Sequence, residues 1–153
     1  YLGIDAADAS FMLGFFALAF IIFAIPAGYL AGRLGRLTTI KLGISGTLAA
    51  FVLLSFIPHP GLGRLFFLLG GLSWALIITN AYPTLMDLTP PEQAGTYTGL
   101  WNVAIALAGL VSPPIYGWVV DLLGYGAFFL TGIAFLVIAL LLIQRVQLAE
   151  SRP

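Results

Sequence analysis

The sequence has little charge and no cysteine. Only 8% of its 153 residues are charged and 61% are hydrophobic, whereas soluble domains carry about 25% charged and about 45–50% apolar residues, so a soluble globular domain is excluded. The six basic and six acidic residues cancel. Without a basic field, nucleic acid is excluded as a partner. The lack of cysteine excludes disulfides, thiolate metal sites and cysteine catalysis.

The few charged residues divide the chain into long uncharged stretches. Five stretches contain no Asp, Glu, Lys or Arg: 9–32, 42–63, 65–86, 93–120 and 122–144. A helix rises about 1.5 Å per residue, so about 20 apolar residues cross a hydrocarbon core of about 30 Å. None of the stretches shows the alternation that is typical of a barrel strand. The sequence therefore predicts an all-α membrane protein with five transmembrane helices in a lipid bilayer.

Prolines mark the ends of the expected spans. The segments 58–61 and 89–91 are rich in proline and cannot continue a helix. We expect kinks at Pro26 and at the pair Pro113 and Pro114, which fall inside spans. The expected spans are about 9–32, 38–57, 65–87, 93–120 and 125–144, followed by a tail at 145–153.

The distribution of basic residues predicts how the chain is oriented. Arg64 lies alone on one side of the membrane, and the other side carries Arg33, Arg36, Lys41, Arg145 and Arg152. The richer side is expected to be cytoplasmic, and so is the C-terminus. Tyr1 then lies outside. Because the chain starts without methionine or a basic leader, we expect it to be a fragment of a longer protein, from which a partner helix is missing.

The spans lack the groups that catalysis needs. No Asp, Glu, Lys, Arg or His lies in the membrane interior of an expected span. The single histidine, His59, sits between two prolines in an expected loop. A metalloprotease needs clustered His and acidic ligands, and an intramembrane serine nucleophile needs a base. We therefore predict that the protein is not an enzyme and has no catalytic residues, metal site or cofactor.

The polar residues of two spans form stripes. One stripe, bordered by Trp74, consists of Gly70, Ser73, Ile77, Asn80 and Thr84, and the other of Thr98, Trp101, Asn102, Ile105, Gly109, Ser112 and Tyr116. Small and polar residues gather at helix contacts, so close packing is one interpretation. The other is a cavity that binds a substrate through Ser73, Trp74, Asn80, Trp101 and Asn102. The fifth span is almost wholly aliphatic or Phe, and we expect it to face lipid.

The segment Gly28-Tyr29-Leu30-Ala31-Gly32-Arg33-Leu34-Gly35-Arg36 resembles the Gly-x-Leu-Ala-Asp-Arg-x-Gly-Arg loop of the major facilitator superfamily. In that family the loop joins helices two and three and recurs between helices eight and nine. Gly32 stands where the family has its acid, which weakens the usual acid contact. Because degenerate copies are more typical of the second repeat, the resemblance favours the second half of the family's twelve-helix bundle.

A second segment supports this placement. The residues 83–102 resemble the junction between helices ten and eleven, with an Asp-x-x-Pro-Pro-Glu-x-x-Gly-x-Tyr-x-Gly pattern similar to the branch of sucrose and glycoside carriers. The resemblance thus covers helices eight to twelve of a partial C-terminal transmembrane domain. It implies a missing N-terminal half of the same chain, and a bacterial-type inner membrane.

The resemblance implies a transporter. It implies a secondary active transporter or uniporter that moves a small solute by alternating access, with a sugar or glycoside as a candidate substrate and a proton or sodium ion as a candidate coupling partner. A cytoplasmic gate would use Gly28, Arg33, Gly35, Arg36, Asp87 and Glu92. Solvated loop charges that only set topology are the alternative. A multidrug-type exporter and a non-transporting membrane scaffold remain as alternative functions.

Overall fold

The chain folds into long helices. The computed structural model describes residues 5–56 and 60–150, and all regular structure there is helical. The helices are α1 (Ala6–Leu34), α2 (Arg36–Phe56), α3 (Pro60–Asp87), α4 (Ala94–Leu123) and α5 (Tyr125–Glu150), with a short 3-10 helix, η1 (Pro91–Gln93), before α4. All five long helices are long and apolar enough to cross a membrane. The predicted all-α membrane fold class is confirmed.

The helix ends differ from the expected spans in a few places. α1 starts at an N-cap, where the Asp5 carboxylate accepts a hydrogen bond of 2.7 Å from the Asp8 N–H. α2 begins at Arg36, before the expected start at 38, and α5 continues to Glu150, so residues 145–150 of the expected tail are helical. Pro26, Pro113 and Pro114 lie inside continuous helices.

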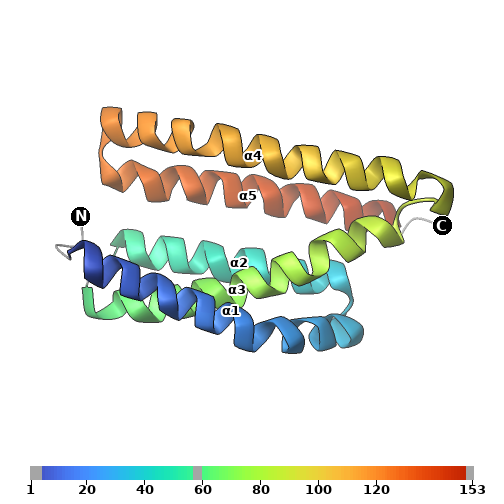
Figure 1. Ribbon diagram of the computed structural model, residues 1–153, viewed down its shortest axis with the longest axis horizontal. Helices are drawn as coiled ribbons and strands as arrows, with labels where there is room; N and C mark the ends of the chain where they lie inside the picture. Colours follow the sequence, from blue (N-terminus) through green and yellow to red (C-terminus); the bar gives the residue numbers. More distant parts are fainter. Residues whose placement is uncertain (1–4, 57–59, 151–153) are drawn as a thin grey trace.

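Helices α1, α2 and α3 form a closely packed unit. α3 packs against both α1 and α2 (Figure 1). At its crossing with α1, a Cβ atom added to Gly71 would lie 2.2 Å from the backbone oxygen of Phe16. At its crossing with α2, a Cβ on Gly43 would lie 2.6 Å from the Ser73 backbone oxygen. Glycine is thus what allows these backbones to approach closely.

Helices α4 and α5 form a second, smaller layer (Figure 1). α5 packs mainly on α2, and the Phe51 ring of α2 lies 5.8 Å from the Phe129 ring of α5. A Cβ on Gly132 would lie 2.5 Å from the Phe51 ring. The expectation that the fifth span faces lipid is therefore wrong for its first half, because phenylalanine and glycine make a helix contact there.

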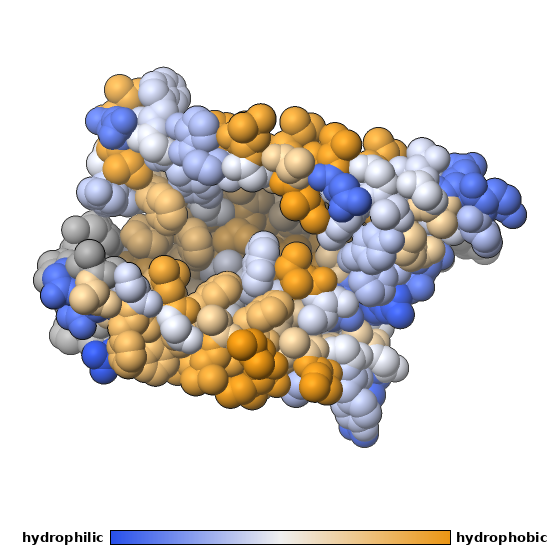
Figure 2. Space-filling view, viewed as in Figure 1, coloured by the Kyte–Doolittle hydropathy of each residue, from blue (hydrophilic) through white to orange (hydrophobic). Residues whose placement is uncertain are grey.

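The outer surface is apolar, as lipid requires. Ile25 is 84% exposed and Leu110 is 72% exposed. Figure 2 shows apolar residues over both layers and a hollow between them. An apolar surface of this extent is typical of a protein that meets a membrane.

Candidate functional site

The turn between α1 and α2 is built around a glycine. Gly35 has φ 85° and ψ 147°, a conformation that is essentially restricted to glycine. Its N–H donates a hydrogen bond of 2.9 Å to the Ala31 carbonyl, and its own carbonyl accepts from the Thr39 N–H at 3.1 Å and the Thr39 hydroxyl at 2.9 Å. These bonds fix the turn, so that Arg36 starts α2 in a defined position.

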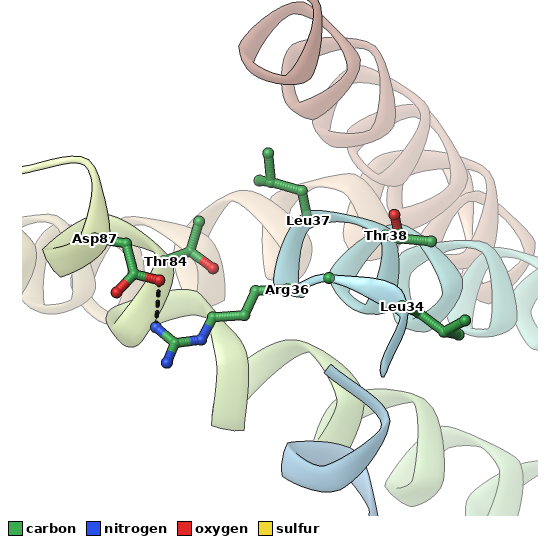
Figure 3. A pocket seen from close by; sticks show the side chains of 7 residues that line it. Leu34, Arg36, Leu37, Thr38, Thr84 and Asp87 are labelled. Carbon is green, nitrogen blue, oxygen red and sulfur yellow. Dashed lines mark hydrogen bonds and ion pairs between the residues drawn. The ribbon is translucent and has the colours of Figure 1, made fainter. Parts of the chain in front are cut away.

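An ion pair joins this turn to the end of α3. Arg36 Nη1 donates to Asp87 Oδ2 at 2.5 Å, and Figure 3 shows the two side chains reaching toward each other. The side chains are 41% and 62% exposed. A pair this exposed is worth about 0.2–1 kcal/mol because solvent screens it. The ion pair therefore stabilises the contact between the α1–α2 turn and α3 only weakly.

The ion pair lies at an open pocket of about 250 Å³. Residues 34–38 form one wall, and Thr84 and Asp87 of α3 form the other (Figure 3). The Thr84 hydroxyl donates a hydrogen bond of 2.7 Å to the Asn80 carbonyl, so the Thr84 side chain is held against its own helix, α3. The pocket therefore lies between the α1–α2 turn and the end of α3.

The other predicted gate residues do not join the pair. Arg33 donates to the Tyr29 hydroxyl at 2.5 Å, and its guanidinium carbon lies 4.7 Å from the centre of the Tyr29 ring. Glu92 is exposed in η1, and within residues 5–56 and 60–150 the structure gives it no salt bridge. Gly28 is exposed, with no atom within 4 Å of an added Cβ. Of the charged residues predicted for the gate, Arg36 and Asp87 form an ion pair with each other in the structure.

Two of the predicted binding residues lie buried between helices. Asn80 is 2% exposed, and its side-chain amide donates to the Leu76 carbonyl at 2.9 Å and to the Ala27 carbonyl of α1 at 3.5 Å. Ser73 is 5% exposed and lies where α3 meets Gly43 and Gly46 of α2. In this conformation both residues take part in helix packing.

Trp74 has a different environment from these two neighbours on α3. It is 44% exposed, although it lies in the middle of a membrane-spanning helix. Its indole N–H is a hydrogen-bond donor on a large apolar ring. Among the predicted binding residues of α3, Trp74 is exposed, whereas Ser73 and Asn80 are buried.

The predicted binding residues of α4 lie near the end of α3. The Trp101 ring lies 5.7 Å from the Tyr82 ring at 57°, and the Tyr82 hydroxyl is 2.8 Å from the Thr98 hydroxyl. Asn102 is exposed. Tyr82 contacts the predicted stripe of α4, although the sequence analysis did not single it out because it lies off the Asn80 stripe. Its aromatic ring with a polar tip, near a helix junction, was the available signal.

The described residues hold no group of three or more His, Cys, Asp or Glu side chains that could bind a metal. His59, which we placed in a loop, lies outside the described residues. The predicted gate residues Gly35, Arg36 and Asp87 line the pocket. The predicted binding residues lie apart from it, on α3 and α4.

The chain is similar in sequence to several known proteins. Among curated relatives, an uncharacterized MFS-type transporter of Bacillus subtilis, YceJ, is 24% identical over 88% of the chain and 34% of its own length. A probable galactarate/D-glucarate transporter of the same organism is 25% identical over 99% of the chain and 35% of its own length. A tetracenomycin C resistance and export protein of Streptomyces glaucescens is 26% identical over 96% of the chain and 28% of its own length.

The chain spans about a third of the length of these relatives. No solved structure matches it significantly. The names of the matched relatives describe transporters, which are not enzymes. The sequence profile described as Major Facilitator Superfamily matches residues 1–153. The predicted resemblance is confirmed at this level, and the chain belongs to the Major Facilitator Superfamily.

Proposed function

We propose that the chain is part of the C-terminal membrane domain of a longer secondary transporter, corresponding to helices eight to twelve of twelve. The proposed domain covers residues 1–153, and the N-terminal half of the same polypeptide completes the transport pathway. Proteins of this architecture expose a site near the middle of the membrane to alternate sides by rocking of two halves. The chain's length, about a third of that of its relatives, supports this proposal.

The proposed alternating-access mechanism is supported by the Arg36–Asp87 ion pair. It joins the α1–α2 turn to the end of α3 across an open pocket. We place this end of the helices in the cytoplasm, because it also carries Arg33 and Lys41. The pair then stabilises the state in which the cytoplasmic side is closed, and its separation accompanies opening.

Charge exchange tests this mechanism in the full-length transporter. Arg36→Asp and Asp87→Arg each place like charges together and should shift the conformational equilibrium toward the cytoplasm-open state by up to about fivefold, which corresponds to about 1 kcal/mol. The double exchange should restore transport toward the original rate. Arg64→Asp, on the other side of the membrane, is the control. Failure of the double exchange to restore any transport would overturn the ion-pair mechanism.

The solute is a small polar molecule, with a sugar or glycoside as our first candidate. Neutral polyols suit aromatic stacking and amide hydrogen bonds, and Trp74, Trp101 and Asn102 offer such groups. The similarity to a probable galactarate/D-glucarate transporter supports a sugar-derived class, including sugar acids. Because no Asp or Glu lies in the middle of the described helices, a coupling proton or sodium ion, if used, binds in the other part of the protein.

Export of a drug-like compound is the second candidate, because one relative is a tetracenomycin C resistance and export protein. Uptake of labelled sugars and sugar acids, measured beside growth in the presence of aromatic antibiotics, separates the two functions. Trp74→Ala should lower the rate for the true solute and leave expression unchanged. If Trp74→Ala and Asn102→Ala alter no flux, a membrane scaffold becomes the better explanation.

A further inference from the structure

Asn80 fixes α3 to α1 shortly before α3 ends. Its side-chain amide donates to the Ala27 carbonyl of α1 at 3.5 Å and to the Leu76 carbonyl of its own helix at 2.9 Å. Asn80 is 2% exposed and Ala27 is 1% exposed, so the contact is buried. The interior of a bilayer has no water to replace such hydrogen bonds. The two helices are therefore held together at this level.

A second contact fixes α3 to α4 two residues later. The Tyr82 hydroxyl lies 2.8 Å from the Thr98 hydroxyl of α4, and the Tyr82 ring lies 5.7 Å from the Trp101 ring. Asn80 and Tyr82 point in directions about 160° apart, because each residue turns the helix by about 100°. α3 is thus held from two sides before it reaches Pro83.

Pro83 weakens the helix directly after these contacts. Proline has no N–H, so Pro83 donates no hydrogen bond to the Thr79 carbonyl, and its ring crowds that carbonyl. The hydroxyl of the next residue, Thr84, donates to the Asn80 carbonyl at 2.7 Å, and a hydrogen bond of this kind often bends a helix. The segment 79–84 is therefore a place where α3 can bend.

The turn of α3 beyond Pro83 is held by weak interactions. Asp87 contributes the ion pair with Arg36, whose two side chains are partly exposed (Figure 3). The Met86 sulfur, a weak acceptor, lies 3.9 Å from the Thr98 hydroxyl. Asp87 lies four residues, or about 6 Å, beyond Pro83. A bend of about 20° at Pro83 moves Asp87 by about 2 Å, and this stretches the 2.5 Å ion pair past the limit of about 4 Å.

We propose that Asn80 is a positioning residue for the opening of the cytoplasmic side, because it confines the movement of α3 to the turn beyond Pro83. The proposal rests on the proposed function, in which the Arg36–Asp87 ion pair separates on opening. Pro83 is the hinge, and Thr84 and Asp87 swing with the pocket wall that they form. Asn80 acts through this turn and needs no contact with the solute.

Distances between pairs of spin labels test the proposal in the full-length transporter, freed of other cysteines, since this chain contributes none. Leu34→Cys and Leu88→Cys label the α1–α2 turn and the residue after α3, where the native leucines are 48% and 46% exposed. Ile22→Cys and Leu69→Cys label α1 and α3 before the hinge, at side chains that are 56% and 38% exposed. Arg36→Asp, added to each pair, removes the ion pair.

In the Arg36→Asp variant the distance between labels 34 and 88 should lengthen by about 2 Å or more, and the distance between labels 22 and 69 should stay constant. Adding Pro83→Ala should cancel the lengthening, because alanine restores a continuous helix. Pro113→Ala, which removes a proline from α4, is the matched control and should leave the lengthening intact. Adding Asn80→Ala should spread the movement, so that the distance between labels 22 and 69 changes as well.

Asn80→Ser, which also lacks the amide, replaces Asn80→Ala if that variant fails to fold. If Asn80 were only structural, its loss would lower stability and leave the distance between labels 22 and 69 unchanged, and this result would overturn the proposal. Lengthening that persists with Pro83→Ala would also overturn it, as would no lengthening with Arg36→Asp. Transport by the double charge exchange of Arg36 and Asp87 separates these failures from failure of the proposed function, because it tests the ion pair without altering the hinge.

Discussion

At the residue scale, Gly35 is a position whose backbone conformation disfavours any residue with a Cβ atom. Its φ of 85° strains any residue with a Cβ, at a cost of about 1–3 kcal/mol. Gly35→Ala should therefore lower the free energy of unfolding by about that amount, measured by thermal unfolding in detergent. Gly28→Ala is the control, because space is open around Gly28 and alanine favours the helix by about 0.5–1 kcal/mol. Equal losses for the two variants would contradict the assignment of strain to Gly35.

Asn80 provides a second test at this scale, because it bridges α3 to the Ala27 carbonyl of α1. Asn80→Ala should cost about 0.6 kcal/mol and at most about 1.7 kcal/mol, the average and the maximum measured for side-chain hydrogen bonds between membrane helices. Asn102→Ala, at an exposed amide of α4, should cost close to nothing. Denaturation by a graded detergent series measures both. A stability loss at Asn102 equal to that at Asn80 would contradict the bridging role.

The sequence singled out several residues of the candidate site, but it did not predict which residues each of them contacts. The two segments that resemble the family, 28–36 and 83–102, contain Gly35, Arg36 and Asp87, and the structure shows why the first is glycine and how the other two meet. The stripe pattern placed Asn80 on a polar face but did not tell helix contact from cavity. Periodicity reports which side of a helix a residue occupies, and tertiary packing decides what lies opposite.

At the element scale, the packing of α3 against α1 depends on one of two adjacent glycines. A Cβ on Gly71 would lie 2.2 Å from the Phe16 backbone oxygen, whereas a Cβ on Gly70 would lie 3.5 Å from the Phe16 ring. Gly71→Ala should destabilise the protein by about 1–3 kcal/mol, because a backbone atom cannot move aside easily. Gly70→Ala should be neutral or stabilising. Thermal unfolding of the two variants checks this, and the reverse order would contradict the observed register of α3.

The existence of the five helices was predictable, but their packing faces were not. Charge-free length predicted five spans because a bilayer demands about 20 apolar residues per helix. It did not predict that the first half of α5 would contact α2 through Phe129 and Gly132. In a membrane, a phenylalanine suits lipid and a helix contact equally well, so hydrophobicity alone does not separate them.

At the scale of the whole molecule, the two ends of α4 report its orientation in the membrane. Glu92 lies in η1, just before the start of α4, and Asp121 lies near the end of α4, and both are exposed. With the Arg36 side in the cytoplasm, a membrane-impermeant maleimide should label Asp121→Cys in intact cells and label Glu92→Cys only after permeabilisation. The absence of native cysteine in the chain makes each signal specific to its site. Labelling in the opposite pattern would reverse the proposed orientation.

The close contacts within α1, α2 and α3 also bear on how the protein is made. These three helices pack on one another within residues 5–87, whereas α4 meets them only near the end of α3 and α5 meets them through α2. Because membrane chains are synthesised from the N-terminal end, this unit can assemble while α4 and α5 are still on the ribosome. The helices that are synthesised first are therefore also the first to pack. The later helices, α4 and α5, then pack against the unit that α1, α2 and α3 have already formed.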